Sequence, residues 1–196
     1  KKPWLRSDRA LVVDAYEYNA IDWTKLAADK RIVGFIGKAT DGLPPPSKCE
    51  DDDDVQLRLC RALWKRYAVA QELFRTRRMI AKALGLKWGA YHVARPGNPI
   101  DQANHFIDFA EPGPDDLVAL DIEEIDPYHW MSLSDAEEFA RHVMRRIGRY
   151  PVLYTNDTTA GFIAAHKQEY PLLSRLPRWY ARYKPDVKDT FPLGNW

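Results

Sequence analysis

The sequence predicts an α/β fold, a single irregular β/α barrel. Two observations predict it: short apolar, β-branched runs alternate with longer stretches of helical periodicity, and polar side chains recur where the apolar runs end. The 196 residues suffice for one domain with a substantial core, so residues 1–196 are expected to form a single domain. The runs expected to form strands are 10–14, 31–40, 87–94, 117–122, 150–156 and 178–183. The stretches expected to form helices are 21–29, 55–84, 101–110, 134–148 and 158–166.

The segment between the second and third predicted strands is unusual. Residues 41–54 contain three consecutive prolines and a run of five acidic residues, so we expect an exposed loop inserted there. The helix that follows, 55–84, is long, and an apolar stripe with a spacing of four runs along its first half. The stripe consists of Val55, Leu59, Leu63 and Tyr67. A later helix, 134–148, begins with the capping-box pair Ser134 and Glu137.

Composition excludes several classes of partner. The formal net charge is +1, which gives no general electrostatic attraction to nucleic acid or to a membrane surface, and neither partner is expected. No segment reaches the roughly 20 apolar residues of a membrane span, and no signal peptide is visible in "KKPWLRSDRA". Cys49 and Cys60 permit either one disulfide or two free thiols. Neither has a His or Cys neighbour at metal-ligand spacing, so no metal or cofactor is expected.

A pair of carboxylates stands at the end of the predicted strand 117–122, in "LVALDIEEID". Side chains alternate along a strand, so Asp121 and Glu123 point to the same face with Cα atoms about 6–7 Å apart. Two like charges that close raise one pKa, which can keep a neutral acid beside an ionised partner. The alternative is that both carboxylates simply enter solvent at the end of the strand.

Polar residues also stand at the carboxyl ends of other predicted strands, the end that carries the active site in a β/α barrel. They are Asp14, Lys38, His92, Tyr154 and Asn156.

Seven motifs occur in order between residues 11 and 183. They are "VVDAYEYNAIDWTKL", "GFIGKATDG", "WGAYHVARP", "NPIDQANHFI", "LVALDIEE", "YPVLYTN" and "LPRWYARY". Together they resemble the family 25 glycoside hydrolases, the Chalaropsis-type lysozymes that cut peptidoglycan. The resemblance implies a TIM-barrel-like fold whose later strands lack full helices. It also implies a last strand bearing another Asp, which is expected to be missing because the sequence stops at Trp196. Asp41 stands where the family has Glu.

The same resemblance implies roles for individual residues. Glu123 is expected to be the general acid, with an ionised Asp121 beside it that raises the pKa of Glu123. Asp121 would act either as a nucleophile or as the carboxylate that orients the 2-acetamido group of the substrate. Asp14 would orient Asp121 or the substrate. The residues expected to bind substrate are Tyr16, Lys38, Asp41, His92, Tyr154 and Trp179; the alternative for His92 is a supporting role.

The implied activity is hydrolysis of the β-1,4 bond between N-acetylmuramic acid and N-acetylglucosamine. The protein would act as a monomer on peptidoglycan glycan strands, as a secreted, periplasmic or envelope enzyme. A Cys49–Cys60 disulfide would persist there. The alternative is a non-catalytic glycan-binding module on the same barrel. In that case the chain would bind glycan without releasing reducing ends.

Overall fold

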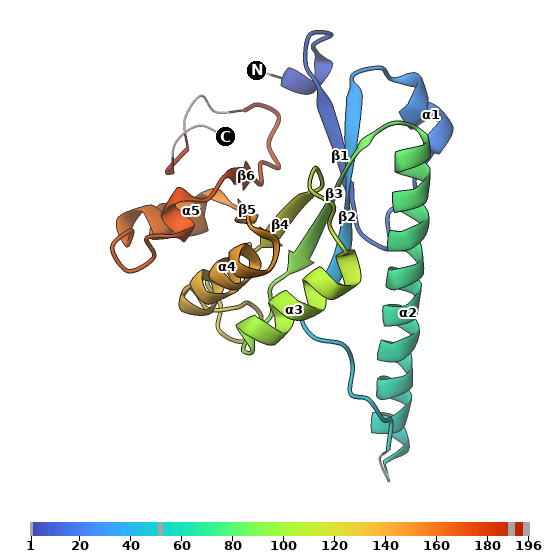
Figure 1. Cartoon of the computed structure of the whole chain (residues 1–196), viewed down its shortest axis with the longest axis vertical. Helices are drawn as coiled ribbons and strands as arrows, with labels where there is room; N and C mark the ends of the chain where they lie inside the picture. The colour runs from blue at the N-terminus through green and yellow to red at the C-terminus, as the bar shows by residue number, and fades with distance from the viewer. Residues whose placement is uncertain (1, 51–52, 188–190, 194–196) are drawn as a thin grey trace.

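The computed structural model describes residues 2–50, 53–187 and 191–193. Six parallel strands form one sheet in sequence order, and the sheet curls into a half-barrel (Figure 1). The strands are β1 (Leu11–Ala15), β2 (Ile32–Asp41), β3 (Lys87–Val93), β4 (Leu117–Asp121), β5 (Val152–Thr155) and β6 (Arg178–Tyr180). The six predicted strands and the barrel-like α/β class are confirmed. The expectation of a missing last strand stays a prediction.

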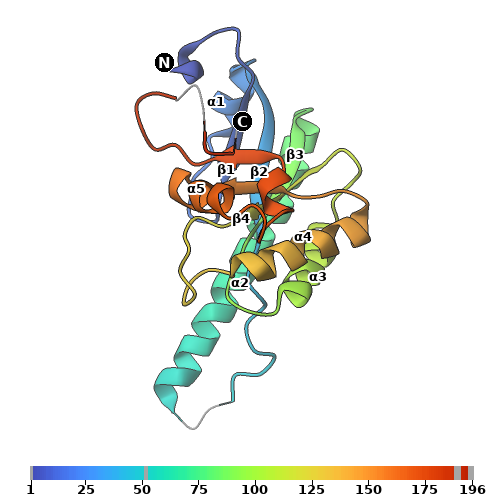
Figure 2. The same cartoon turned by 90° about the vertical axis from the view of Figure 1, so that its left-hand side faces the viewer.

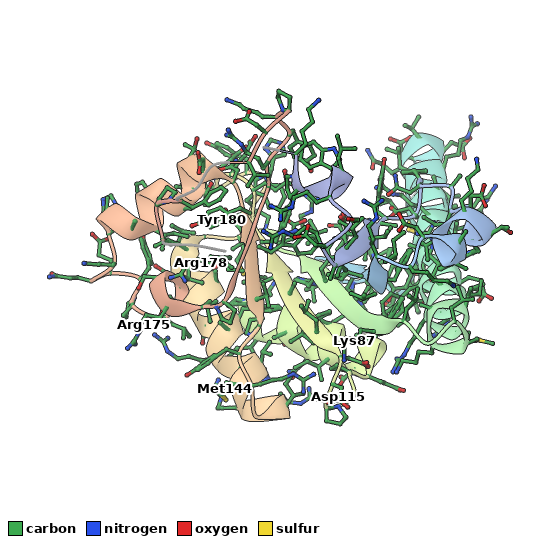
Figure 3. All side chains as sticks on the ribbon, turned by 90° about the horizontal axis from the view of Figure 1, so that it is seen from above. Lys87, Asp115, Met144, Arg175, Arg178 and Tyr180 are labelled. Carbon is green, nitrogen blue, oxygen red and sulfur yellow. A yellow bond between two sulfur atoms is a disulfide. The ribbon has the colours of Figure 1, made fainter. Side chains whose placement is uncertain are left out.

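Five helices lie on one side of this sheet or at its edges (Figure 2). They are α1 (Trp23–Ala28), α2 (Asp54–Ala83), α3 (Pro99–Ala110), α4 (Leu133–Ile147) and α5 (Asp157–Ala165), with short 3-10 turns at Pro3–Leu5 and Leu173–Arg175. Each α-helix begins and ends within two residues of its predicted limits. α2 contacts β2 and β3, and α3 packs against both β2 and α4. Figure 3 shows α2 at one side of the molecule, away from the C-terminal elements around Arg178 and Tyr180.

The core fills the space between the sheet and these helices. Phe35 of β2 stacks on Trp88 of β3, and Phe74 of α2 meets the Trp88 ring edge to face. A Cβ atom at position 37 would lie 3.1 Å from the Trp88 ring, so Gly37 allows α2 and β3 to approach β2 this closely. Phe106 of α3 is fully buried in the same core.

The predicted apolar stripe of α2 is present, but most of it is exposed. The three fully buried residues of α2 lie between positions 74 and 81. Val55, Leu59 and Leu63 are 60%, 53% and 52% exposed. A helix of 30 residues is about 45 Å long, whereas the seven-residue strand β3 spans about 23 Å. The sheet therefore covers only the C-terminal part of α2, and its N-terminal half projects beyond the body (Figure 1).

A disulfide and a loop brace the projecting half of α2. Cys49 and Cys60 are bonded, with a Cα–Cα distance of 5.6 Å, which confirms the predicted pairing. Trp64 Nε1 donates a hydrogen bond to the Pro46 carbonyl at 2.8 Å. Most of the predicted loop therefore lies along one side of α2. Asp51 and Asp52, which belong to that predicted loop, lie outside the described residues.

The predicted capping box of α4 is wrong. Ser132 is the N-cap, and its side chain accepts a hydrogen bond from the Asp135 N–H at 3.1 Å. Glu137 faces the interior instead of the helix start, because it lies on the buried side of α4. Its Oε1 accepts hydrogen bonds from the backbone N–H groups of Leu172 and Leu173, both at 2.7 Å. Glu137 therefore fixes the chain that leads into β6.

Replacing Glu137 with Ala should lower the free energy of unfolding by roughly 2–5 kcal/mol, because two buried N–H donors would lose their acceptor. Urea unfolding followed by circular dichroism measures this loss. Glu138→Ala is the matched control, since Glu138 is an exposed neighbour on the same helix, and it should change stability by no more than about 0.5 kcal/mol. Equal losses in the two variants would contradict the role assigned to Glu137.

Candidate active site

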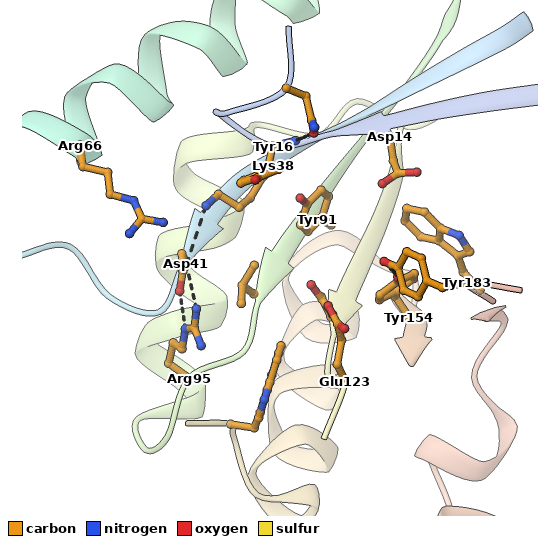
Figure 4. Close-up of a pocket in the computed structure, with 15 residues that line it drawn as sticks. Asp14, Tyr16, Lys38, Asp41, Arg66, Tyr91, Arg95, Glu123, Tyr154 and Tyr183 are labelled. Carbon is orange, nitrogen blue, oxygen red and sulfur yellow. Dashed lines mark hydrogen bonds and ion pairs between the residues drawn. The ribbon is translucent and has the colours of Figure 1, made fainter. Parts of the chain in front are cut away.

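The register of the parallel sheet places five side chains in one row. Asp41, Val93, Asp121, Tyr154 and Trp179 are successive Cα partners on β2 through β6. Partners on adjacent strands point to the same face of a sheet. All five line a pocket of about 600 Å3 at the carboxyl ends of the strands (Figure 4). This is the edge at which the sequence predicts an active site.

Two further rows complete the pocket. Closer to the starts of the strands, Lys38 of β2 pairs with Tyr91 of β3. In the row before that, Asp14 of β1 pairs with Ile36 of β2. Lys38 and Asp41 are three residues apart, so a regular strand would point them to opposite faces. The register shifts between Lys38 and Thr40, and this irregularity brings the side chains of Lys38 and Asp41 into the pocket. Lys38 Nζ lies 3.8 Å from Asp41 Oδ2.

Eight of the nine residues predicted for the site line this pocket. They are Asp14, Tyr16, Lys38, Asp41, Asp121, Glu123, Tyr154 and Trp179. Seven lining residues were not predicted. They are Asn19, Arg66, Tyr91, Val93, Arg95, Trp130 and Tyr183.

Strand alternation could have found two of the missed residues. His92 was predicted from the motif around β3, and its neighbours Tyr91 and Val93 point to the opposite face. No such pattern points to Arg66 or Tyr183, which reach the pocket from α2 and from the chain after β6.

His92 does not line the pocket, which corrects its predicted role in substrate binding. Its side chain is 0% exposed on the helix-facing side of β3. Thr40 Oγ1 lies 2.7 Å from His92 Nδ1, and Gln102 Oε1 lies 2.9 Å from His92 Nε2. Gln102 Oε1 also accepts the Arg95 N–H at 3.1 Å, and Gln102 Nε2 donates to the Arg95 carbonyl at 2.8 Å. His92 therefore supports the loop that carries Arg95 into the pocket.

The protonation of His92 follows from these contacts. Gln102 directs its amide nitrogen to backbone carbonyls, so its oxygen accepts the proton of His92 Nε2. His92 Nδ1 then accepts from the Thr40 hydroxyl. Burial lowers the pKa of His92 to about 4, so the ring is neutral at neutral pH.

Hydrogen bonds from the chains on both sides hold the backbone that carries the two central carboxylates. The Asp121 carbonyl accepts the Ala94 N–H at 3.1 Å, and the Ile122 N–H donates to the Tyr154 carbonyl at 3.0 Å. The Glu123 carbonyl accepts from Asn156 Nδ2 at 2.5 Å and from Thr159 Oγ1 at 2.9 Å. The chain beyond β4 is thus fixed although the strand has ended. The alternative reading, two carboxylates released into solvent, does not hold for Asp121, which is 7% exposed.

The pKa values of both central carboxylates are raised, whereas the sequence argument raises only that of Glu123. Burial, and then the charge of Glu123, raise the pKa of Asp121 to about 8. Burial, and then the charge of Glu124, also raise the pKa of Glu123. Asp121 lies inside the strand at the pocket floor, whereas Glu123 lies beyond the strand end and is only half-buried. Asp121 therefore holds a proton at neutral pH, contrary to the expectation that it stays ionised.

The cations of the pocket pair with other carboxylates. Arg95 Nε and Nη2 donate to Asp41 at 2.5 and 3.1 Å, and the Arg95 guanidinium lies over the Trp130 ring at 5.4 Å. Burial favours a higher pKa for Asp41, but Arg95 and then Lys38 outweigh it and hold that pKa below its usual range. Lys38 Nζ lies 2.6 Å from Glu17, a buried carboxylate that the sequence did not single out.

The two central carboxylates lack such partners. Within the described part of the chain, neither Asp121 nor Glu123 forms an ion pair, and Asp121 Oδ1 has no hydrogen-bond partner. Because Asp121 lines the pocket, this oxygen is open to a hydrogen bond from a bound molecule.

Residues 67–196 match the family model described as glycosyl hydrolases family 25. The chain belongs to this family. The family 25 match includes Asp121, Glu123, Tyr154 and Trp179, whereas Asp14 and the strands β1 and β2 precede it. As a member, the protein is a glycoside hydrolase.

Two solved structures share the fold of this family 25 hydrolase. A muramidase from Acremonium alcalophilum aligns with a TM-score of 0.64 and 21% identity, over 96% of this chain and 84% of its own. The catalytic domain of endolysin ply40 from bacteriophage P40 of Listeria monocytogenes aligns with a TM-score of 0.59 and 18% identity, over 94% of this chain and 81% of its own. No curated protein matches the sequence.

Among residues 2–50, 53–187 and 191–193, no three His, Cys, Asp or Glu side chains are grouped as metal ligands would be. Within the same ranges no helix is long and apolar enough to cross a membrane.

The raised pKa of Asp121 predicts a pH-dependent stability. Between about pH 4, where an unfolded Asp titrates, and about pH 8, the folded protein keeps a proton that the unfolded chain has released. The unfolded state then binds fewer protons, so this group lowers the free energy of unfolding as pH rises, by up to about 1.4 kcal/mol per pH unit. Asp121→Asn should remove this slope and be more stable than wild type at pH 8.

Urea unfolding at one-unit intervals from pH 4 to pH 9 measures the slope. Glu138→Gln, a change at an exposed carboxylate on α4, is the control and should leave it unchanged. An Asp121→Asn slope identical to that of wild type would contradict the raised pKa.

Proposed function

We propose that this family 25 hydrolase is an N-acetylmuramidase that cleaves the β-1,4 bond between N-acetylmuramic acid and N-acetylglucosamine. The observation that carries the proposal is the Asp121–Glu123 pair at the pocket floor, with raised pKa values and a buried, unpartnered Asp121 oxygen. The family match supports hydrolysis of a glycosidic bond. The names of the two similar structures, a muramidase and an endolysin, support peptidoglycan as the substrate.

Glu123 is the general acid in this proposal. Glycoside hydrolysis needs a carboxylic acid that is still protonated near neutral pH to protonate the leaving oxygen. Burial and the charge of Glu124 raise the pKa of Glu123 in the required direction. Asn156 and Thr159 hold its backbone carbonyl, which fixes the point from which the side chain enters the pocket.

Asp121 orients the 2-acetamido group of the substrate. The acetamido N–H donates to Asp121 Oδ1, and the acetamido oxygen attacks the anomeric carbon as the glycosidic C–O bond breaks. A hydrogen bond to the ionised form lowers the pKa of Asp121, so its proton passes to Glu123 when substrate binds. Glu123 gives that proton to the leaving oxygen and later takes one from the water that opens the intermediate. Because Asp121 is neutral in the free enzyme, direct nucleophilic attack by it is the less favoured role.

The remaining lining residues bind and orient the glycan. Tyr154 and Trp179 meet edge to face, with ring centroids 4.6 Å apart, and offer apolar faces to sugar rings. Asp14, whose pKa burial raises, lies across the pocket floor and would orient Asp121 or the substrate. Tyr16, Lys38 and Asp41 supply polar contacts.

The site of action is proposed to be outside the cytoplasm. The Cys49–Cys60 disulfide persists in an oxidising compartment, where peptidoglycan also lies.

Digestion of purified peptidoglycan followed by mass spectrometry tests the bond that is cleaved. Products should carry reducing N-acetylmuramic acid ends. Reducing N-acetylglucosamine ends would show cleavage of the other glycosidic bond. Binding without any release of reducing ends would instead favour the non-catalytic glycan-binding module.

Replacing Glu123 with Gln should lower kcat on peptidoglycan by at least about 100-fold, because the shape is kept and the proton donor is lost. Asp14→Asn should lower kcat less. Glu124→Gln is the matched control, and it should keep kcat within about threefold, since Glu124 is exposed. It should also move the alkaline limb of activity to lower pH, because the charge of Glu124 helps to raise the pKa of Glu123. Near-wild-type kcat in Glu123→Gln would rule out this acid.

A further inference from the structure

We propose that the projecting half of α2 carries a docking face for the peptide stems of peptidoglycan. The face consists of Val55, Leu59, Ala62, Leu63 and Arg66, and is called the stem-binding face below. This inference rests on the proposed function and deepens it, because it names the part of the substrate that lies outside the pocket.

The stem-binding face stands beside the mouth of the pocket. α2 crosses back over a sheet whose strands are all parallel, so it begins at the carboxyl ends of the strands, where the pocket opens (Figure 1). Its buried residues lie between positions 74 and 81, near the helix end. The twelve residues from Val55 to Arg66 therefore extend past the sheet on the side of the pocket.

Arg66 makes the stem-binding face continuous with the pocket. It is three residues from Leu63 and seven from Leu59, so all three share one side of the helix. Arg66 lines the pocket (Figure 4). Its guanidinium lies over the Tyr18 ring at 5.4 Å. Tyr18 is 66% exposed and meets the pocket residue Tyr16 edge to face at 5.5 Å. Apolar and cationic groups thus lead from the pocket onto α2.

The projecting helix is braced on one side and open on the other. The disulfide at Cys60 and the hydrogen bond from Trp64 hold the preceding loop against it. At the other end, Arg77 donates to the carbonyls of Tyr16 and Asn19 at 2.8 and 2.5 Å. Val55, Leu59 and Leu63 nevertheless stay more than half exposed. Exposed aliphatic side chains on a rigid support mark a binding surface.

The chemistry of the peptide stems fits this face. Stems branch from the lactyl group of N-acetylmuramic acid, so a glycan held in the pocket directs them outward past the pocket rim. They combine alanine methyl groups with free carboxylates. Aliphatic side chains are complementary to the methyl groups. Arg66 donates to Glu17 Oε1 at 3.2 Å, but its side chain stays 52% exposed and is complementary to a carboxylate, and Arg58 and Lys65 are exposed nearby.

The test compares two substrates that differ only in the stems: glycan strands that carry them, and the same strands after an amidase has removed them. Wild-type kcat/KM should be about tenfold higher on the stem-bearing strands, the scale of about 1.4 kcal/mol expected for two partly buried Leu side chains. The double variant Leu59→Ser/Leu63→Ser should lose this preference and keep wild-type kcat/KM on stripped strands. Met79→Ser is the control, a 73% exposed apolar residue on the opposite side of α2, and it should keep the preference.

Three outcomes would overturn the proposal: equal losses on both substrates, no loss on either, or a change in sedimentation coefficient showing that the face joins two copies of this chain. If wild type hydrolyses neither substrate, the proposed function fails and the docking face is tested separately. Calorimetry with a soluble stem-bearing muropeptide and its stripped disaccharide then measures binding. Weaker binding of the muropeptide alone in the double variant would support the docking face, and equal binding would overturn it.

Discussion

The alternation of side chains between the two faces of the sheet, along β3 and β4 around Asp121, is the constraint on which the site depends. Tyr91, Val93 and Asp121, all at odd positions, line the pocket, and their neighbours His92 and Leu120 lie on the opposite face of the sheet. A slip by one residue would exchange the two sets and bury Asp121 among aromatic rings of α3 and α4. The hydrogen bonds from Ala94 to Asp121 and from Ile122 to Tyr154 hold the strands in place. His92, tied to Thr40 and Gln102, adds a polar lock on the other face. A residue outside the pocket therefore helps to decide which side chains line it.

The distribution of cations explains why the central carboxylates have raised pKa values. The pocket contains three cationic side chains, and Arg95 and Lys38 are bound to Asp41 and Glu17 while Arg66 also lies near Glu17. Burial then acts on Asp121 and Glu123 without an opposing ion pair. The same arrangement that destabilises the folded protein toward alkaline pH provides a carboxylic acid near neutral pH. The raised pKa that favours a protonated carboxyl group near neutral pH thus lowers the free energy of unfolding as pH rises.

Local patterns in the sequence were sufficient for the strands, the helices and most of the floor of the site. Strand alternation placed Asp121 with Glu123, and strand ends gave Lys38 and Tyr154. The same reasoning failed for His92. The curl of the whole sheet decides which of its two faces borders the pocket, and alternation along one strand does not reveal it. Glu137 was misassigned because a capping-box spacing does not reveal that a helix turns that carboxylate toward Leu172 and Leu173.

Contacts between segments distant in the sequence could not be predicted at all. Arg66 reaches the pocket because α2 is longer than the sheet it packs on, and Tyr183 because the chain folds back after β6. The raised pKa of Asp121 likewise required knowledge of its burial, since charge proximity alone treats the two carboxylates alike.

The curl of the sheet also bears on how a long polymer could be engaged. In the described part of the chain β1 and β6 are the two edge strands and do not pair with each other, so the carboxylates lie in a trough. Asp14 stands toward one edge and Trp179 toward the other, and Tyr183 at the second edge is 86% exposed. A polysaccharide can be laid into a trough from the side, without threading a free chain end. Scission would then fall at interior bonds, and a network would lose its mechanical continuity long before it dissolved into small fragments.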